Sequence, residues 1–180
     1  DLKIFLKPSE ALRRYWKVKR DVQSRGYSSE KVLEAIEKRM GDSLSHVLNQ
    51  ETNADIIFSI ENTQNVDPDQ TEESDLAMVL RITCANDIYF ERLLDALRSK
   101  IGLKITHNID HVKQEITLEG QVEAPIIREV AFCLGLDLED LTGINPIWSD
   151  DYLGLMQIFL LYQVNTQLKR EGMYVKMNEL

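Results

Sequence analysis

The feature that most constrains this sequence is a short basic segment, residues 13–25, inside an acidic chain. The segment holds six Lys or Arg and one Asp, a local charge of +5, whereas the whole chain carries −9. Pro8-Ser9 before it is a helix start signal, and Gly26 after it is typical of a helix end. The pattern therefore predicts one capped helix over residues 9–24 that holds several cations close together.

The helical period sorts the side chains of this segment onto two sides. At about 100° per residue, an apolar side is formed by Leu12, Tyr15, Trp16, Val18 and Val22. Another side carries Arg13, Lys17 and Arg20, and Arg25 stands in the last turn. Such a concentrated positive patch indicates a specific anion and argues against general nucleic-acid affinity. A second interpretation stays open at this point, because most charged helix faces are simply solvated.

Two stretches resemble one enzyme family. The run YWKVKRDVQSRGYSSEKVLEAIEKR, followed by DS and NADIIFSIE, has the order and spacing of three elements of phosphoribulokinases and uridine kinases. These are a Lys-x-x-Arg-Asp-x-x-x-Arg-Gly lid segment, a helix, and an Ala-Asp-Ile-Ile strand. The resemblance covers residues 1–61, and the later LEGQV and DDYLGLMQIFLLYQVNTQL resemble closing segments of phosphoribulokinase. It implies an α/β fold, the C-terminal part of a P-loop kinase-like domain, with a mixed sheet, flanking helices and a β-hairpin.

The resemblance also implies roles for the cations. Lys17 and Arg20 match lid cations that approach the phosphates, which makes them the catalytic candidates. Arg25 matches the lid arginine beside the glycine, and Arg25 and Arg13 are the phosphate-binding candidates. Planar Arg binds two phosphate oxygens at once and Lys acts as a point charge, so both suit the charge that spreads over a transferring phosphoryl group. No metal site is predicted.

One part of such a kinase is missing from the sequence. A P-loop needs Gly-x-x-x-x-Gly-Lys-Ser/Thr, and no Gly in this chain is followed by Lys. In the family, the P-loop and the catalytic carboxylate lie upstream of the strand that residues 1–6 resemble. We therefore expect a chain that begins inside a domain, holds no cofactor alone and is inactive alone, with ATP and Mg²⁺ belonging to the complete enzyme. The acceptor, a sugar phosphate or a nucleoside, stays open.

Local patterns divide the chain into three parts. Residues 1–61 are predicted to hold the lid helices and flanking strands, residues 62–76 an acidic loop or linker, and residues 77–180 an α+β portion. The expected elements are a strand at 2–7, the basic helix, a helix from Ser28 or Ser29 to Gly41, a turn near 43–49, a buried strand at 54–60, a strand at 78–83, a helix capped by Asn86 or Asp87, a hairpin turning at Asp110-His111, a helix from Pro125 to Gly135, and a long helix from Ser149 or Asp150.

Composition narrows the partners and the location. No apolar run approaches the ~18 residues of a membrane span, so no membrane is expected as a partner. Nucleic acid is not expected either, because the chain is acidic overall and its cations are concentrated in one short segment. We expect a nucleotide and a sugar phosphate bound through the missing N-terminal half, a homo-oligomer, and a cytoplasmic or plastid-stromal location. Cys84 and Cys133 are expected as buried free thiols. The alternative function is a non-catalytic interaction or dimerisation module built on residues 77–180.

Overall fold

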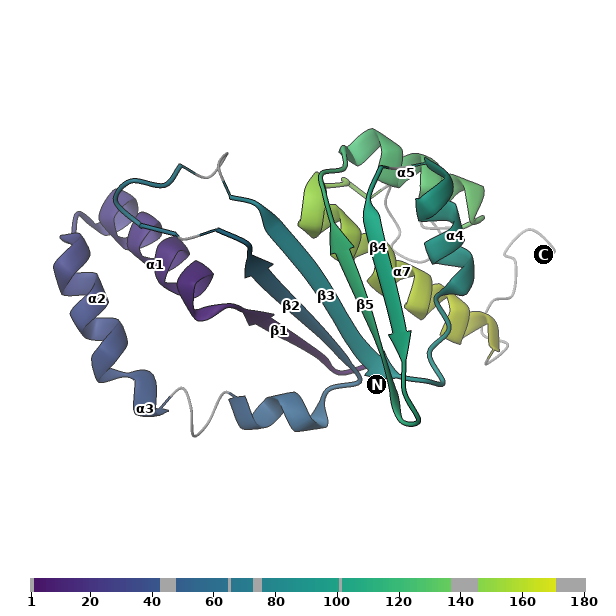
Figure 1. Ribbon diagram of the computed structural model, residues 1–180, viewed down its shortest axis with the longest axis horizontal. Helices are drawn as coiled ribbons and strands as arrows, with labels where there is room; N and C mark the ends of the chain where they lie inside the picture. The colour runs from purple at the N-terminus through teal and green to yellow at the C-terminus, as the bar shows by residue number, and fades with distance from the viewer. Residues whose placement is uncertain are drawn as a thin grey trace, which may run out of the picture. The chain divides into compact units, whose positions relative to one another are not determined.

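The computed structural model describes residues 2–42, 48–64, 66–72, 76–100, 102–136 and 146–170 (Figure 1). The chain forms two compact units. The first comprises Asp1–Asn86 with Thr106–Glu119, and the second comprises Asp87–Ile105 with Gly120–Leu180. Within the described residues, no helix has both the length and the apolar character needed to cross a membrane.

A mixed five-stranded sheet organises the first unit. Its strands run in the order β1-β2-β3-β5-β4, where β1 is Ile4–Pro8, β2 is Ile56–Asn62, β3 is Met78–Ala85, β4 is Lys104–Ile109 and β5 is Lys113–Glu119. β1 and β2 are parallel, whereas β2, β3 and β5 pair antiparallel. A parallel pair needs a crossover connection, and the helices between β1 and β2 provide it. The predicted α/β class with a mixed sheet and a hairpin is confirmed.

One face of the three central strands is apolar. Cross-strand rows on this face join Phe58 to Ile82 and Ile82 to Ile116, all buried. The buried strand expected at 54–60 corresponds to β2, Ile56–Asn62, which begins two residues later than expected. Its side chains alternate between buried and half-buried positions, as expected when one face of a sheet packs on a core.

The basic helix is confirmed as α1, Glu10–Arg25. The Ser9 hydroxyl accepts a hydrogen bond from the Leu12 N–H at 3.4 Å. At the other end Gly26 has φ +66°, and its N–H donates to the Val22 carbonyl at 3.1 Å. This left-handed position favours glycine and closes the helix, which places Arg25 in the last turn.

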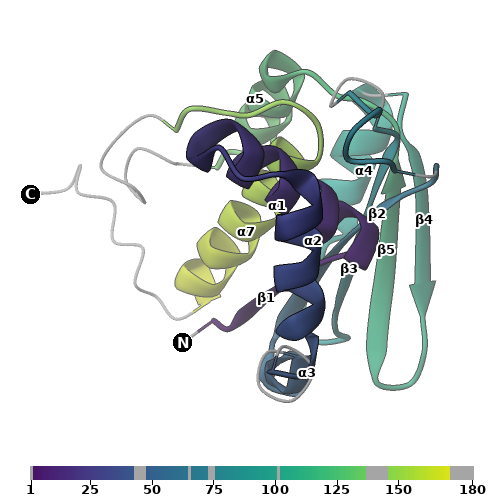
Figure 2. The ribbon, with the colours of Figure 1, turned by 90° about the vertical axis from the view of Figure 1, so that its left-hand side faces the viewer.

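A second helix, α2, Ser29–Lys38, lies beside α1 (Figure 2). Val18 of α1 packs with Val32 and Ile36 of α2 in a small apolar core. The Ser28 hydroxyl caps α2 as predicted, but the helix stops at Lys38, before Gly41. Gly41 instead lies in a separate helical turn, α3, Met40–Asp42. The helices α1 and α2 together are called the α1–α2 pair below.

The predicted linker at 62–76 connects two neighbouring strands of the first unit, β2 and β3. A 3₁₀ helix, η2, Leu48–Asn53, precedes β2, while residues 43–47 of the predicted turn lie outside the described residues. The helix expected after Asn86 begins five residues later. The Asn86 side-chain amide donates to the Asp110 carbonyl at 2.7 Å, so this side chain serves the hairpin rather than a helix start.

Among its described residues, the second unit contains three longer helices, α4 (Glu91–Lys100), α5 (Ala124–Cys133) and α7 (Asp151–Arg170). Phe90 packs edge-to-face on Phe159 with ring centroids 4.9 Å apart. At Gly154 a Cβ atom would lie 2.0 Å from the Ser149 carbonyl oxygen, so only glycine permits this close approach at the start of α7. Cys133, expected to be buried, is exposed, whereas Cys84 is buried in β3.

Candidate functional site

The strongest candidate site is a cluster at the C-terminal end of α1, formed by Arg20, Asp21 and Arg25. The Arg20 Nε donates to Asp21 Oδ1 at 2.8 Å, and the Arg25 Nη1 lies 3.5 Å from the same oxygen. Only 6% of the Asp21 side chain is exposed, against 58% for Arg20 and 56% for Arg25. One buried carboxylate therefore holds two guanidinium groups that remain open to solvent.

The charges of the cluster keep Asp21 ionised. The hydrogen bond from Arg20 lowers the pKa of Asp21 below its ordinary value, and the charges of Arg20, Arg25 and Lys17 act in the same direction against the effect of burial. The carboxylate in turn raises the pKa of Arg20. Lys17 is half-buried and takes part in no ion pair among the described residues, yet its charge reaches Asp21.

The cations at the N-terminal end of α1 are bound differently. Arg13 makes two hydrogen bonds to Glu10, at 2.7 and 2.9 Å, in a bidentate pair. Arg14 binds Glu10 at 2.8 Å and also Glu37 of α2 at 2.5 Å. These side chains are 35% and 27% exposed. The hydrogen bond from Arg13 is the main cause of the lowered pKa of Glu10, which burial opposes and Arg14 supports.

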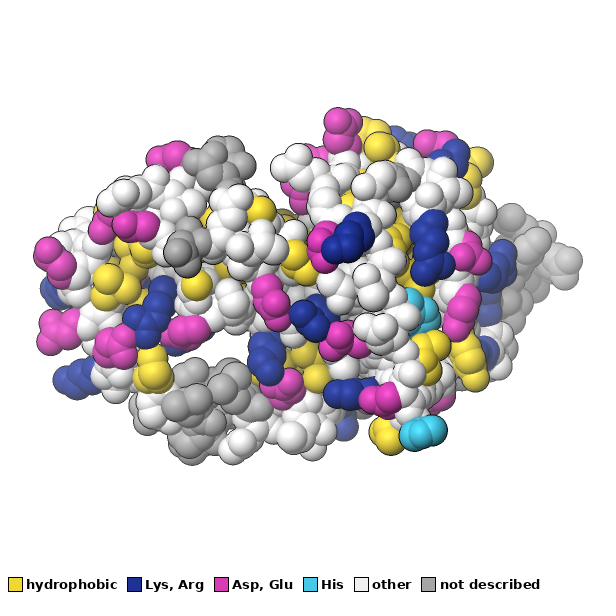
Figure 3. All heavy atoms as spheres, viewed as in Figure 1, with side chains coloured by type: hydrophobic (Ala, Val, Ile, Leu, Met, Phe, Trp, Pro, Cys, Tyr) yellow, Lys and Arg dark blue, Asp and Glu magenta, His cyan; other side chains and the backbone are white. Residues whose placement is uncertain are grey.

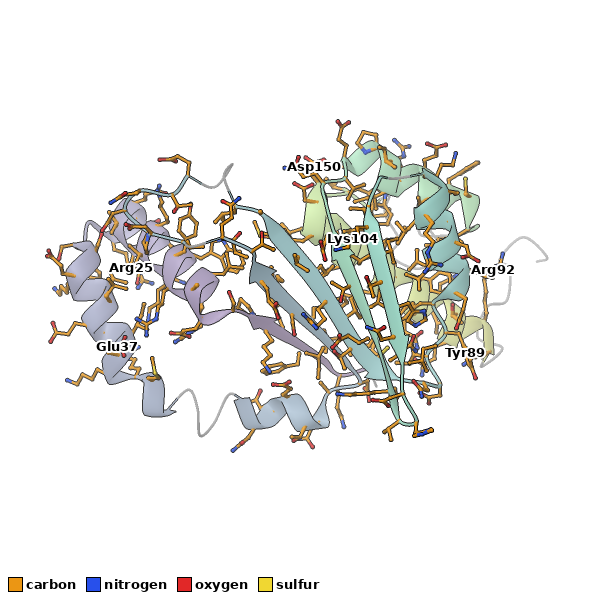
Figure 4. All side chains as sticks on the ribbon, in the orientation of Figure 1. Arg25, Glu37, Tyr89, Arg92, Lys104 and Asp150 are labelled. Atoms are coloured by element: carbon orange, nitrogen blue, oxygen red, sulfur yellow. The ribbon has the colours of Figure 1, made fainter. Side chains whose placement is uncertain are left out.

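The four predicted site residues thus fall into two groups. Arg20 and Arg25 come together on one carboxylate, and Lys17 lies within electrostatic range of it. Arg13 stands about 10 Å along the helix axis from Arg20, at 1.5 Å per residue, and is paired with Glu10. Figure 4 shows Arg25 near the junction of the α1–α2 pair and Glu37 toward the other end of α2.

Asp21 is the site residue that the sequence analysis missed. The sequence does signal its pairing with Arg25, because an Asp at position i pairs favourably with an Arg at i+4 on the same helix face. Over the α1–α2 pair, cationic and acidic side chains lie next to one another (Figure 3). Counting cations alone therefore overstates how much positive charge is available there.

A cavity of about 420 Å³ in the second unit is a weaker candidate for an anion. Its lining includes Lys100, but this ammonium is held by Glu129 at 2.5 Å. Glu123, Asp150 and Asp151 line the same cavity, which has the wrong charge for phosphate. Within the described ranges, no group of three or more His, Cys, Asp or Glu side chains is placed to hold a metal ion.

Comparisons with known proteins bear on the fold and on the segment of the chain that contains α1. The sequence profile of the Phosphoribulokinase / Uridine kinase family matches residues 1–67. Among solved structures, a phosphoribulokinase from Rhodobacter spheroides is similar at 23% identity with a TM-score of 0.52. That alignment covers 78% of this chain and 48% of the other, so the chain spans about half the length of the enzyme it matches. No curated protein matches the chain.

The structural likeness supports a P-loop kinase-like α/β fold for the chain. The resemblance to the phosphoribulokinase / uridine kinase family is confirmed, with residues 1–67 as the matched segment. This segment contains α1, α2 and β2 and therefore the whole Arg20–Asp21–Arg25 cluster.

Proposed function

We propose that the chain supplies the lid and the C-terminal portion of an ATP-dependent kinase that phosphorylates a sugar phosphate or a nucleoside. The observation that carries the proposal is the pair of exposed guanidinium groups, Arg20 and Arg25, fixed on buried Asp21. The cluster lies in the segment that matches the kinase family, which independently favours phosphate as the ligand.

The geometry suits a phosphate better than a single carboxylate. Arg20 uses its Nε and Arg25 one Nη for Asp21, so each guanidinium keeps further N–H donors for an outer ligand. Two planar groups with fixed positions can bind several oxygens of one phosphoryl group. In the proposed reaction they would stabilise the negative charge that spreads over the equatorial oxygens during transfer.

The residues present fit the phosphate part of ATP, which would supply the transferred group. Lys17 adds a third positive charge, one to two turns before Arg20 and Arg25 on α1. We propose Lys17 and Arg20 as the catalytic cations and Arg25 as a phosphate ligand. Arg13 has a smaller proposed role, because Glu10 already binds the Nε and Nη2 donors along one edge of its guanidinium group. No Mg²⁺ ligand is assigned among the described residues.

The test is the affinity of the chain for pyrophosphate and ATP, followed by ³¹P NMR. Substituting Lys17→Ala with Arg20→Ala should weaken binding at least tenfold, because charge-assisted hydrogen bonds are lost. The matched control is Lys38→Ala with Arg39→Ala, which removes the same charge at the end of α2. Equal losses in both double variants would mean that only net charge matters and would contradict the proposal.

We further propose that turnover requires a P-loop portion that this sequence lacks. The purified 180-residue chain should show no ATP-dependent phosphorylation of ribulose 5-phosphate or uridine above a blank without protein. Measurable turnover by this chain would contradict that expectation while leaving the phosphate-binding cluster in place.

A second candidate function is self-association or partner docking through the second unit. Phe132 of α5 is 84% exposed and Ile147 is 90% exposed, so both present most of an apolar side chain to solvent. We propose that they take part in a homo-oligomer contact. Sedimentation of the chain should show a concentration-dependent oligomer that Phe132→Ser and Ile147→Ser abolish. A monomer at all concentrations, in the unsubstituted chain, would contradict this candidate.

A further inference from the structure

The connection between β2 and β3 contains a turn, residues 67–71, with its own hydrogen-bond framework. The Thr71 N–H donates to the Asp67 carbonyl at 2.8 Å, and the Asp67 N–H donates to the Thr71 hydroxyl at 2.9 Å. The Asp69 N–H donates to the Asp67 carboxylate at 3.0 Å. This framework leaves the Asp69 side chain out of the turn's own bonding and available to another element.

That other element is the α1–α2 pair. The Ser29 hydroxyl donates to Asp69 Oδ1 at 2.6 Å, across 40 residues of sequence. Ser29 is the first residue of α2, where the helix dipole favours a negative charge. Figure 1 shows the β2–β3 connection running out beside the junction of α1 and α2, away from the strands that it joins.

The α1–α2 pair is also tied at its opposite end, but by a different kind of bond. There the Ser9 N–H donates to the Ile60 carbonyl at 2.7 Å. The Ser9 tie is backbone to backbone at the entry of α1. The Ser29–Asp69 tie joins two side chains at the surface, and such bonds open readily by local fluctuation.

We propose that the 67–71 turn is a latch on the far end of the α1–α2 pair, closed by the Ser29–Asp69 hydrogen bond. Opening the latch frees the junction that carries Arg25, four residues before Ser29. The catalytic consequence, a change in when the arginines meet phosphate, rests on the proposed function. The latch itself does not depend on it.

Amide hydrogen exchange of the full chain, measured without phosphate, tests the latch. Ser29→Ala and Asp69→Ala should each speed exchange at residues 30–33 by about 3- to 10-fold. The double variant should exchange no faster than the faster single variant, because both remove one bond. Gln70→Ala and Glu72→Gln, in the same connection, are the controls and should stay within twofold of the unsubstituted chain.

A second readout separates the latch from folding of the turn. Exchange of the Thr71 amide, which bonds within the turn, should be unchanged in Ser29→Ala. Unchanged exchange at residues 30–33 in both single variants would overturn the latch, and so would additive effects in the double variant or equal effects in the controls.

The pyrophosphate affinity of the same proteins distinguishes failure of the latch from failure of the proposed function. Normal pyrophosphate binding together with unchanged amide exchange at residues 30–33 in both single variants contradicts only the latch. Absent binding with the expected exchange pattern contradicts only the proposed phosphate site.

Discussion

The two ends of α1 carry the same kind of side chain but bind it in different ways. At the N-terminal end, Arg13 and Arg14 pair with surface carboxylates, and Arg14 also joins α1 to α2 through Glu37. At the C-terminal end, Arg20 and Arg25 share one buried carboxylate and remain more than half exposed. We propose from this difference that burial of the anion, more than the number of cations, decides which end of α1 can bind an outer ligand.

The largest expected difference between the two ends is in phosphate affinity. Arg20→Ala with Arg25→Ala should weaken pyrophosphate binding about 30-fold, since each guanidinium gives charge-assisted hydrogen bonds. Arg13→Ala with Arg14→Ala removes the same charge and should weaken binding less than about threefold. Isothermal titration or ³¹P NMR on both variants checks this. Equal losses of pyrophosphate affinity in the two double variants would contradict the proposed difference between the two ends of α1.

Asp21→Asn sharpens the comparison, because its effect on net charge and its effect on arginine positioning change the pyrophosphate affinity in opposite directions. The substitution removes a negative charge, so net charge alone predicts tighter pyrophosphate binding. Loss of the carboxylate also frees Arg20 and Arg25 from their fixed positions, and we expect roughly tenfold weaker binding from that loss of positioning. Glu10→Gln, at the other end, is the matched control and should change affinity less than about twofold. Tighter binding by Asp21→Asn would contradict the positioning role.

Acid titration compares the two carboxylates in a single experiment. The folded chain holds the pKa of Asp21 and of Glu10 below their ordinary values of 3.8 and 4.5. Each group therefore contributes stability that is present above its ordinary pKa and lost as pH falls through the lowered folded value. The Tm should fall between pH 5 and pH 2 by less in Asp21→Asn and in Glu10→Gln than in the unsubstituted chain. The same fall of Tm with pH in all three proteins would contradict the lowered pKa of Asp21 and of Glu10.

The smallest effect is expected for the ion pair between Arg14 of α1 and Glu37 of α2. Glu37→Ala removes the partner of Arg14 on α2, an exposed ion pair that is worth about 0.2–1 kcal/mol of unfolding free energy. Urea denaturation should show this small loss, with pyrophosphate affinity unchanged within about twofold. A large loss of affinity would show that the N-terminal end of α1 also serves the proposed ligand.

Local signals in the sequence were sufficient for α1. Ser9 and Gly26 mark its two ends correctly, because capping depends on residues within one turn of the helix end. The start of α4 was misplaced because the Asn86 side chain bonds to Asp110, which is distant in sequence. The end of α2 at Lys38 follows from no signal that the sequence pattern showed.

The candidate site was predictable only in part. The family motif predicted Lys17, Arg20 and Arg25 as site residues, but a count of cations cannot say which carboxylate each one binds. The pairing of Arg13 with Glu10 follows from their i, i+3 spacing and could have been expected. The role of Asp21 depends on its burial, which sequence spacing alone does not give.

The most direct measurement is an NMR titration of the arginine side-chain Nε–H signals with pyrophosphate. We expect saturable shifts for Arg20 and Arg25, with the signals of Arg13 and Arg14 unmoved at the same ligand concentrations. Equal shifts at all four arginines, or shifts confined to Arg13 and Arg14, would contradict the claim that the buried Asp21 carboxylate builds the phosphate site.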